Sequence, residues 1–153
     1  MAGRYYEDFR VGEVIVSPET YEVTQENLHA FAADFDPQPM HLDEAAAEST
    51  VFGQLTASGW HTLAATMRLM VLSPLFASGE VVGVGIDKLR WLKPVLPGYV
   101  LTAQAEILEM RPSKSRTDRG YLRLRTTTFG PDRLEVTSQE QTVLIPRRPR
   151  ETD

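Results

Sequence analysis

WHTLAATMRLMVL, residues 60 to 72, is the stretch that decides how this chain is expected to fold. Nine of its 13 residues are apolar, and its polar residues do not gather on one face. A helix that is apolar nearly all round is buried, so the stretch predicts a helix that runs through the middle of the domain. The stretch is too short to cross a bilayer, which takes about 20 residues.

After this helix, the apolar residues recur with a period of two, which is typical of β-strands. Valine and isoleucine alternate with glycine over residues 82–86, and the alternation has changed phase at Leu89. The phase change predicts a β-bulge near Asp87 and Lys88. Three further strands are predicted over residues 99–107, 121–129 and 134–145. We expect the four consecutive strands to form a meander.

Before the helix, the pattern predicts an extended segment over residues 13–23 that is bent at Pro18. A helix capped by Thr24 is predicted over residues 25–35, and a short helix over residues 43–49. Strands that follow one another, instead of alternating with helices, indicate an α+β fold with an antiparallel sheet wrapped around the buried helix. We expect a single domain over 1–153, with its core at about 5–146 and a frayed tail over 147–153.

The composition of the 153 residues is that of an ordinary globular protein, with a formal net charge of −5 and no cysteine. This charge argues against nucleic acid as the main partner. The N-terminal residues lack the apolar core of a signal peptide, so we expect a cytoplasmic protein that does not bind membranes. Two small basic groups are expected to be a solvated loop and a solvated tail. They are Lys114, Arg116 and Arg119, and Arg147, Arg148 and Arg150.

The loop FAADFDPQPMHLD, residues 31–43, places an acid at Asp36 and a histidine at His41 on a segment stiffened by Pro37 and Pro39. Asp36 falls at the C-terminal end of its predicted helix, where the dipole disfavours a negative charge, so we expect a slightly raised pKa. One interpretation is a rigid loop that aims both side chains at a substrate. The other is a surface turn that contains a hydrogen-bonded histidine.

The segment TASGWHT, residues 56–62, offers Ser58 as an N-cap and Gly59 as a point of close backbone approach. Unpaired N–H groups at the start of a buried helix can bind an anion or a developing oxyanion. The alternative is a plain capped helix start. Taken together with the loop, the segment supplies the parts for proton transfer next to a carbonyl. No metal site is expected, because His41 and Asp43 would supply only two ligands.

These segments resemble the MaoC-like dehydratases, a family that includes the (R)-specific enoyl-CoA hydratases. The hydratase motif runs roughly F-A-x…D-x-N-P-x-H-x-D…A…F-G…G. This chain reads FAADFDPQPMHLD, then AAAESTVFG, then ASGWHT, and later KPVLPG. The resemblance covers about residues 5–146.

The resemblance implies a hot dog fold and a homodimer or higher oligomer that acts on an acyl-CoA or acyl-carrier thioester. No separate cofactor is implied, because CoA enters as part of the substrate. Asp36 and His41 would hold and activate a water that adds across a trans-2-enoyl thioester. Gly59 would donate its N–H to the thioester oxygen. Gln38, Ser58 and Trp60 would be further substrate-binding residues.

The chain departs from the family pattern at several positions. Gln38 stands in place of the motif asparagine, Ser58 precedes Gly59 where histidine is usual, and Tyr99 replaces a common acid. Thr66 and Met67 stand where hydratases often have a serine. Two alternatives stay open: an acyl-thioesterase on the same fold, and a domain that binds acyl-CoA or a partner without catalysis. Lys114, Arg116 and Arg119 are candidates to meet the CoA phosphates.

Overall fold

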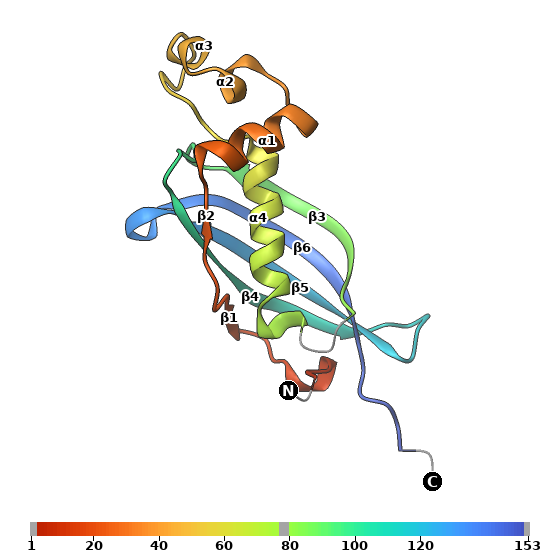
Figure 1. Ribbon diagram of the computed structural model, residues 1–153. Helices are drawn as coiled ribbons and strands as arrows, with labels where there is room; N and C mark the ends of the chain where they lie inside the picture. The colour runs from red at the N-terminus through yellow and green to blue at the C-terminus, as the bar shows by residue number, and fades with distance from the viewer. Residues whose placement is uncertain (1–2, 77–79, 152–153) are drawn as a thin grey trace.

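The computed structural model describes residues 3–76 and 80–151. A curved antiparallel sheet packs along helix α4 (Gly59–Val71), and three shorter helices gather at the N-terminal end of α4 (Figure 1). The predicted α+β class, with one central helix against an antiparallel sheet, is confirmed. The other helices are α1 (Gln25–Phe35), α2 (Pro39–Leu42) and α3 (Glu44–Glu48). The strands are β1 (Val14–Val16), β2 (Tyr21–Glu22), β3 (Val82–Trp91), β4 (Val100–Pro112), β5 (Arg119–Phe129) and β6 (Glu135–Pro146).

The burial of α4 differs from the prediction on one of its faces. Ala65, Leu69 and Met70 are buried. Trp60 and Met67, by contrast, are 58% and 56% exposed on the single chain. The helix is therefore covered by the sheet on one side, while its second apolar side is left open.

The strand order is β1-β4-β5-β6-β3, and β2 also pairs with β4. Only β4, β5 and β6 form a meander, so the expectation of four meandering strands is wrong for β3, which lies beside β6. Reaching β4 from β3 means crossing about 15 Å of sheet. The connection over residues 92–99 is long enough for this, since extended chain covers about 3.3 Å per residue.

The core lies between α4 and the inner face of the sheet. Leu101, Ala103, Ala105 and Ile107 are all 1% exposed or less, as the period-two pattern of that segment predicts. Strand β4 thus contributes every second side chain over residues 101–107 to the core, and the intervening side chains are more exposed.

Strand β3 is an edge strand whose apolar side chains are exposed. Val82, Val84 and Ile86 are 44%, 56% and 57% exposed. Its pairing with β6 shifts register between Asp87 and Arg90, where the bulge was predicted, and also between Gly83 and Gly85. Exposed apolar side chains on an edge strand are unusual on a free monomer, because unpaired edges promote association with another strand.

The N-terminal half mostly follows the sequence pattern. Thr24 caps α1 by accepting a hydrogen bond from the N–H of Asn27 at 3.1 Å. Helix α3 corresponds to the predicted short helix, while the single turn α2 was not predicted. The extended segment before α1 divides into β1 and β2 on either side of Pro18, and both strands pair with β4.

The C-terminal tail is held at its first residues. The guanidinium of Arg147 donates to Glu7 at 2.9 Å, and that of Arg148 donates to Asp8 at 2.5 Å. The expected fraying therefore does not apply to Arg147 and Arg148. Residues 152 and 153 of the expected tail lie outside the described part of the chain.

Two of the basic residues in the β4–β5 hairpin are paired with acids. Arg116 pairs with Asp118 and Arg119 with Glu80, at the end of the sheet away from α1, α2 and α3 (Figure 1).

Over residues 3–76 and 80–151, no helix has both the length and the apolar character needed to cross a bilayer.

Candidate active site

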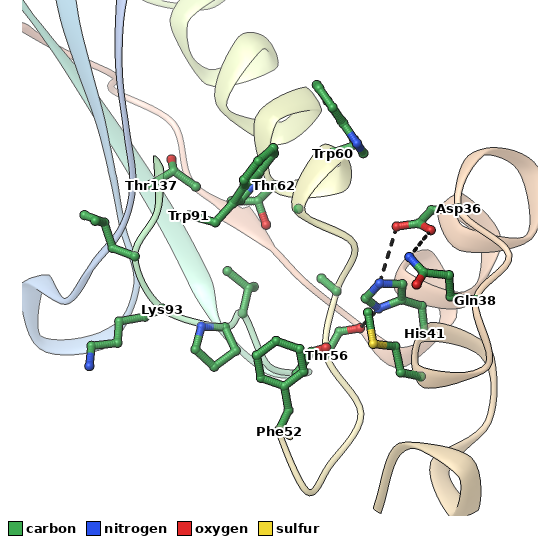
Figure 2. Close-up of a pocket in the computed structure, with 16 residues that line it drawn as sticks. Asp36, Gln38, His41, Phe52, Thr56, Trp60, Thr62, Trp91, Lys93 and Thr137 are labelled. Carbon is green, nitrogen blue, oxygen red and sulfur yellow. Dashed lines mark hydrogen bonds and ion pairs between the residues drawn. The ribbon is translucent and has the colours of Figure 1, made fainter. Parts of the chain in front are cut away.

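The end of α1 and the turn α2 place Asp36 and His41 side by side. Asp36 is the C-cap of α1, and its carbonyl accepts from the N–H of Gln38 at 2.8 Å. Pro39 then starts α2, where proline is favoured because its fixed φ suits the first helical position. The Nε2 atom of His41 lies 3.3 Å from Oδ2 of Asp36 (Figure 2).

The ring of His41 is held from its other nitrogen. Its Nδ1 lies 2.6 Å from the carbonyl oxygen of Thr56, and the residue is 4% exposed. A carbonyl oxygen only accepts hydrogen bonds, so Nδ1 carries the proton. In the neutral ring Nε2 is therefore the unprotonated nitrogen, and it faces Asp36. The pair can hold one proton between them or a water that donates to both.

Asp36 receives two hydrogen bonds from side chains. Ser58 Oγ donates to Oδ2 at 2.7 Å, and Gln38 Nε2 donates to Oδ1 at 2.7 Å. Burial raises the pKa of Asp36, but these two bonds and the charge of His41 outweigh it and lower the pKa below its ordinary value. The expectation of a raised pKa was wrong, because hydrogen bonds to the charged form dominate over the helix dipole.

Ser58 joins the loop to the start of α4. Besides donating to Asp36, its Oγ accepts from the N–H of Trp60 at 3.3 Å, as an N-cap does. Gly59 is the first residue of α4 and lines the cavity beside Asp36. The first N–H groups of a helix have no partner within it, so they are available to an oxygen bound in this cavity.

Gly59 also lets Trp91 come close to the helix. A Cβ built on Gly59 would lie 2.7 Å from Cε2 of Trp91, closer than a real side chain allows. The indole of Trp91 packs against that of Trp60 at 5.4 Å between ring centroids.

The cavity has a volume of about 340 Å³. It brings together most of the predicted site residues, namely Asp36, Gln38, His41, Gly59 and Trp60. Ser58 does not line it and is 1% exposed, so it supports Asp36 from behind.

Several residues of the cavity were not predicted for the site. They are Met40, Phe52, Thr56, Ala57, Thr62, Trp91, Leu92, Lys93, Pro94, Val95 and Thr137. Figure 2 places Trp91, Thr62 and Thr137 across from Asp36 and His41. The sequence offered one signal, the segment beginning at Lys93, because it matches a family segment. Thr62 and Thr137 come from α4 and β6, and only the packing of helix on sheet brings them together.

In the described residues, no three histidine, aspartate or glutamate side chains are grouped closely enough to hold a metal ion.

Known proteins share this arrangement of helix, sheet and loop. The MaoC like domain family model matches residues 8–128. The MaoC-like dehydratase from Rhodospirillum rubrum is 40% identical with a TM-score of 0.91, over 97% of this chain and 100% of that one. The unliganded R-hydratase PhaJ1 from Pseudomonas aeruginosa is 25% identical with a TM-score of 0.76, over 97% and 92%.

A relative of similar length also matches along nearly the whole chain. The uncharacterized protein YdeM of Bacillus subtilis (strain 168) is 30% identical over 92% of this chain and 98% of its own length. The chain therefore belongs to the family of MaoC-like domains, and its fold is the hot dog fold of that family.

Proposed function

We propose that this protein is a hydratase that adds water reversibly across the double bond of a trans-2-enoyl thioester. One observation carries the proposal: Oδ2 of Asp36 and Nε2 of His41 lie 3.3 Å apart in a cavity that also contains the start of α4. Similarity to a MaoC-like dehydratase and to an R-hydratase supports this reaction class.

In the proposed step, Asp36 and His41 hold one water between them. The lowered pKa keeps Asp36 ionised at neutral pH, so both groups accept hydrogen bonds from the water. The oxygen of the water bonds to C3 of the enoyl chain while one of its protons passes to the pair. The pair returns that proton to C2, so one water is added in total, and dehydration is the reverse.

The thioester oxygen gains negative charge as C3 is attacked. The N–H of Gly59, at the positive end of α4, would donate a hydrogen bond to this oxygen. Preorganised donors of this kind are worth about 3–4 kcal/mol of transition-state stabilisation each.

The carrier of the acyl group is CoA or an acyl carrier protein, both of which end in a phosphate-bearing pantetheine. Lys93 is exposed and lines the same cavity, so its ammonium group is a candidate to bind such a phosphate. Arg116 and Arg119 are less suited, because each is already paired with an acid.

We also propose that the working protein is a homodimer in which a second copy covers β3. The edge strand exposes Val82, Val84 and Ile86, and the open face of α4 exposes Met67 nearby. A second copy would pair the unpaired edge and bury these apolar side chains.

Turnover of trans-2-enoyl-CoA thioesters of increasing chain length tests the proposed function. Loss of the conjugated double bond and release of free thiol are followed together for the wild type, Asp36→Asn and His41→Gln. Asp34→Asn is the matched control, since Asp34 is exposed on the same helix and lies outside the cavity.

We expect loss of the double bond without thiol release, abolished in the first two variants and retained in the control. Thiol release would favour the thioesterase instead. Tight binding of CoA esters without either signal would favour a binding domain.

A further inference from the structure

The indole of Trp91 borders the candidate active site where helix α4 begins. Trp91 is the last residue of β3, and it lines the same cavity as Gly59. Figure 2 shows its ring across the cavity from Asp36 and His41. The side chain is 47% exposed on the single chain, and it lies at the other end of β3 from the apolar residues proposed to meet a second copy. A ligand in the cavity can therefore contact it.

The ring nitrogen is the part of Trp91 that comes closest to Gly59. Of the surrounding atoms, Nε1 would be the nearest to a Cβ built on Gly59, ahead of Cε2 at 2.7 Å and Cδ1 at 2.8 Å. A Cβ lies about 2.5 Å from its own backbone nitrogen, so Nε1 is within about 5 Å of the nitrogen of Gly59. Two N–H donors at this separation can share one oxygen, because each reaches about 2.9 Å.

The N–H bond of Trp91 does not point into Gly59. The two ring carbons beside the nitrogen are nearly as close to the Cβ position as the nitrogen itself, so Gly59 lies against the face of the ring. A Cβ in line with the N–H bond would be about 1 Å farther from both carbons than from the nitrogen. The indole N–H lies in the plane of the ring and so runs past Gly59. Among the described residues, neither this N–H nor that of Gly59 has a hydrogen-bond acceptor.

The ring of Trp91 is also held in place. The indole of Trp60 packs against it at 5.4 Å between centroids, with the two planes at 76°. A donor that is fixed before the substrate binds needs no reorganisation when charge develops on the acceptor.

Building on the proposed function, we propose that the indole N–H of Trp91 is a second donor to the thioester oxygen, beside the N–H of Gly59. That oxygen gains negative charge as water attacks C3. Both hydrogen bonds strengthen with this charge, so they stabilise the transition state more than the bound substrate. A phenylalanine would fill the same space beside Gly59 but would supply no donor.

Nuclear magnetic resonance tests the contact without turnover. The chain has two tryptophans, so a spectrum that correlates each nitrogen with its proton contains two indole signals, and Trp60→Phe shows which belongs to Trp91. One probe is a butanoyl-CoA analogue in which a methylene group replaces the sulfur, so that it can be neither hydrated nor hydrolysed. The other is S-butyl-CoA, which lacks the carbonyl group. We expect the first probe alone to move the Trp91 proton signal downfield, as a hydrogen bond to oxygen does.

Kinetics test whether the contact serves catalysis. Trp91→Phe should lower kcat by about 100-fold for the best enoyl-CoA substrate, with a much smaller change in KM, because the lost donor acts mainly in the transition state. Replacement of Trp91 by benzothienylalanine keeps the bicyclic ring but puts sulfur in place of the N–H, and it should cause the same loss. A loss in Trp91→Phe that benzothienylalanine restores would show that the shape of the ring matters and would overturn the inference.

A Trp91 signal that responds equally to both probes, or to neither, also overturns the inference. Unchanged kcat in both variants does the same. A downfield shift with the carbonyl probe alone, combined with no turnover of any enoyl-CoA, would instead overturn the hydratase and leave Trp91 and Gly59 standing as a pair of donors to a bound carbonyl group.

Discussion

The hydroxyl of Ser58 donates to Oδ2 of Asp36 at 2.7 Å, and this bond ties the start of the central helix to the loop that carries the acid. The same oxygen of Asp36 faces His41. Ser58 therefore acts on two properties together, the stability of α4 through capping and the ionisation of Asp36. A serine at this position, where histidine is usual in the family motif, gives the acid a neutral donor.

Ser58→Ala should lower activity and move the acid limb of the pH–rate profile to higher pH. The bond stabilises the ionised carboxylate, so its loss raises the pKa of Asp36. We also expect the free energy of unfolding to fall by about 1 kcal/mol through the lost cap. Kinetics across pH 4 to 9 and urea denaturation measure the two effects. Ser58→Thr keeps a hydroxyl and should restore the limb; an acid limb at the same pH in all three proteins would contradict the assignment.

Gln38→Leu should have a smaller effect confined to low pH. Gln38 is exposed and donates to Oδ1, the oxygen that does not face His41, so little stability depends on it. Turnover at pH 8 should stay within about twofold of the wild type, with a clear loss only at the acid end, near pH 4, because loss of this bond raises the pKa of Asp36. The comparison with Gln38→Asn asks whether the motif asparagine can make the same bond. An equal loss at both pH values would instead indicate a direct contact between Gln38 and the substrate.

The stability of the protein should depend on the ionisation of Asp36 in acid. The pKa of Asp36 is lowered in the folded state, so its contribution is complete above the unfolded value of about 3.9. The contribution is lost as pH falls through the lower folded pKa. We expect the stability advantage of the wild type over Asp36→Asn to be largest at pH 6 and smallest below pH 3. Urea denaturation at each pH measures it, and an advantage that stays constant across this range would refute the linkage.

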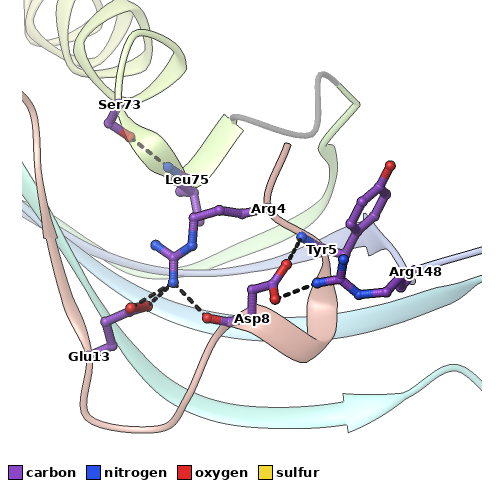
Figure 3. Close-up of polar contacts among 7 residues, drawn as sticks. All are labelled: Arg4, Tyr5, Asp8, Glu13, Ser73, Leu75 and Arg148. Carbon is purple, nitrogen blue, oxygen red and sulfur yellow. Dashed lines mark hydrogen bonds and ion pairs between the residues drawn. The ribbon is translucent and has the colours of Figure 1, made fainter. Parts of the chain in front are cut away.

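Local signals in the sequence predicted much of the fold. The cap residue Thr24 predicted where α1 begins, and the change of phase after residue 86 located the bulge in β3. The place of β3 beside β6 was missed, because periodicity reports which face a residue occupies and not which strand lies next to it. The contacts that hold Arg148 were also not predicted. Its partner Asp8 lies near the other end of the sequence, and a local pattern does not report such distant contacts (Figure 3).

The candidate site was predictable where its residues are close in sequence. Asp36 and His41 are five residues apart on a proline-stiffened segment, and they do meet. The contacts that tune them come from elsewhere, through Ser58 and the carbonyl of Thr56. The sign of the pKa shift of Asp36 depended on those contacts, so the helix dipole alone gave the wrong direction.

Val84→Lys should convert the proposed dimer into monomers. Val84 is 56% exposed on β3, so lysine costs little on a single chain, but it would bury a charge if a second copy pairs with this edge. Val14→Lys is the matched control, because Val14 is 48% exposed on β1, at the opposite edge of the sheet. Light scattering after size-exclusion chromatography gives the masses. A monomeric wild type, or a dimer unaffected by Val84→Lys, would show that the second copy does not sit on β3.

Gly59→Ala should destabilise the protein through Trp91 and not through the helix. Alanine is the better helix former, so a substitution within α4 would by itself be neutral or favourable. The added Cβ would, however, lie 2.7 Å from the Trp91 ring, and overpacking of this kind costs about 1–3 kcal/mol. In a Trp91→Ala background the same change should cost nothing, because the clash is gone. A double-mutant cycle followed by urea denaturation measures the coupling. A cost for Gly59→Ala that is the same in both backgrounds would mean that glycine is needed there for a reason other than room for the indole.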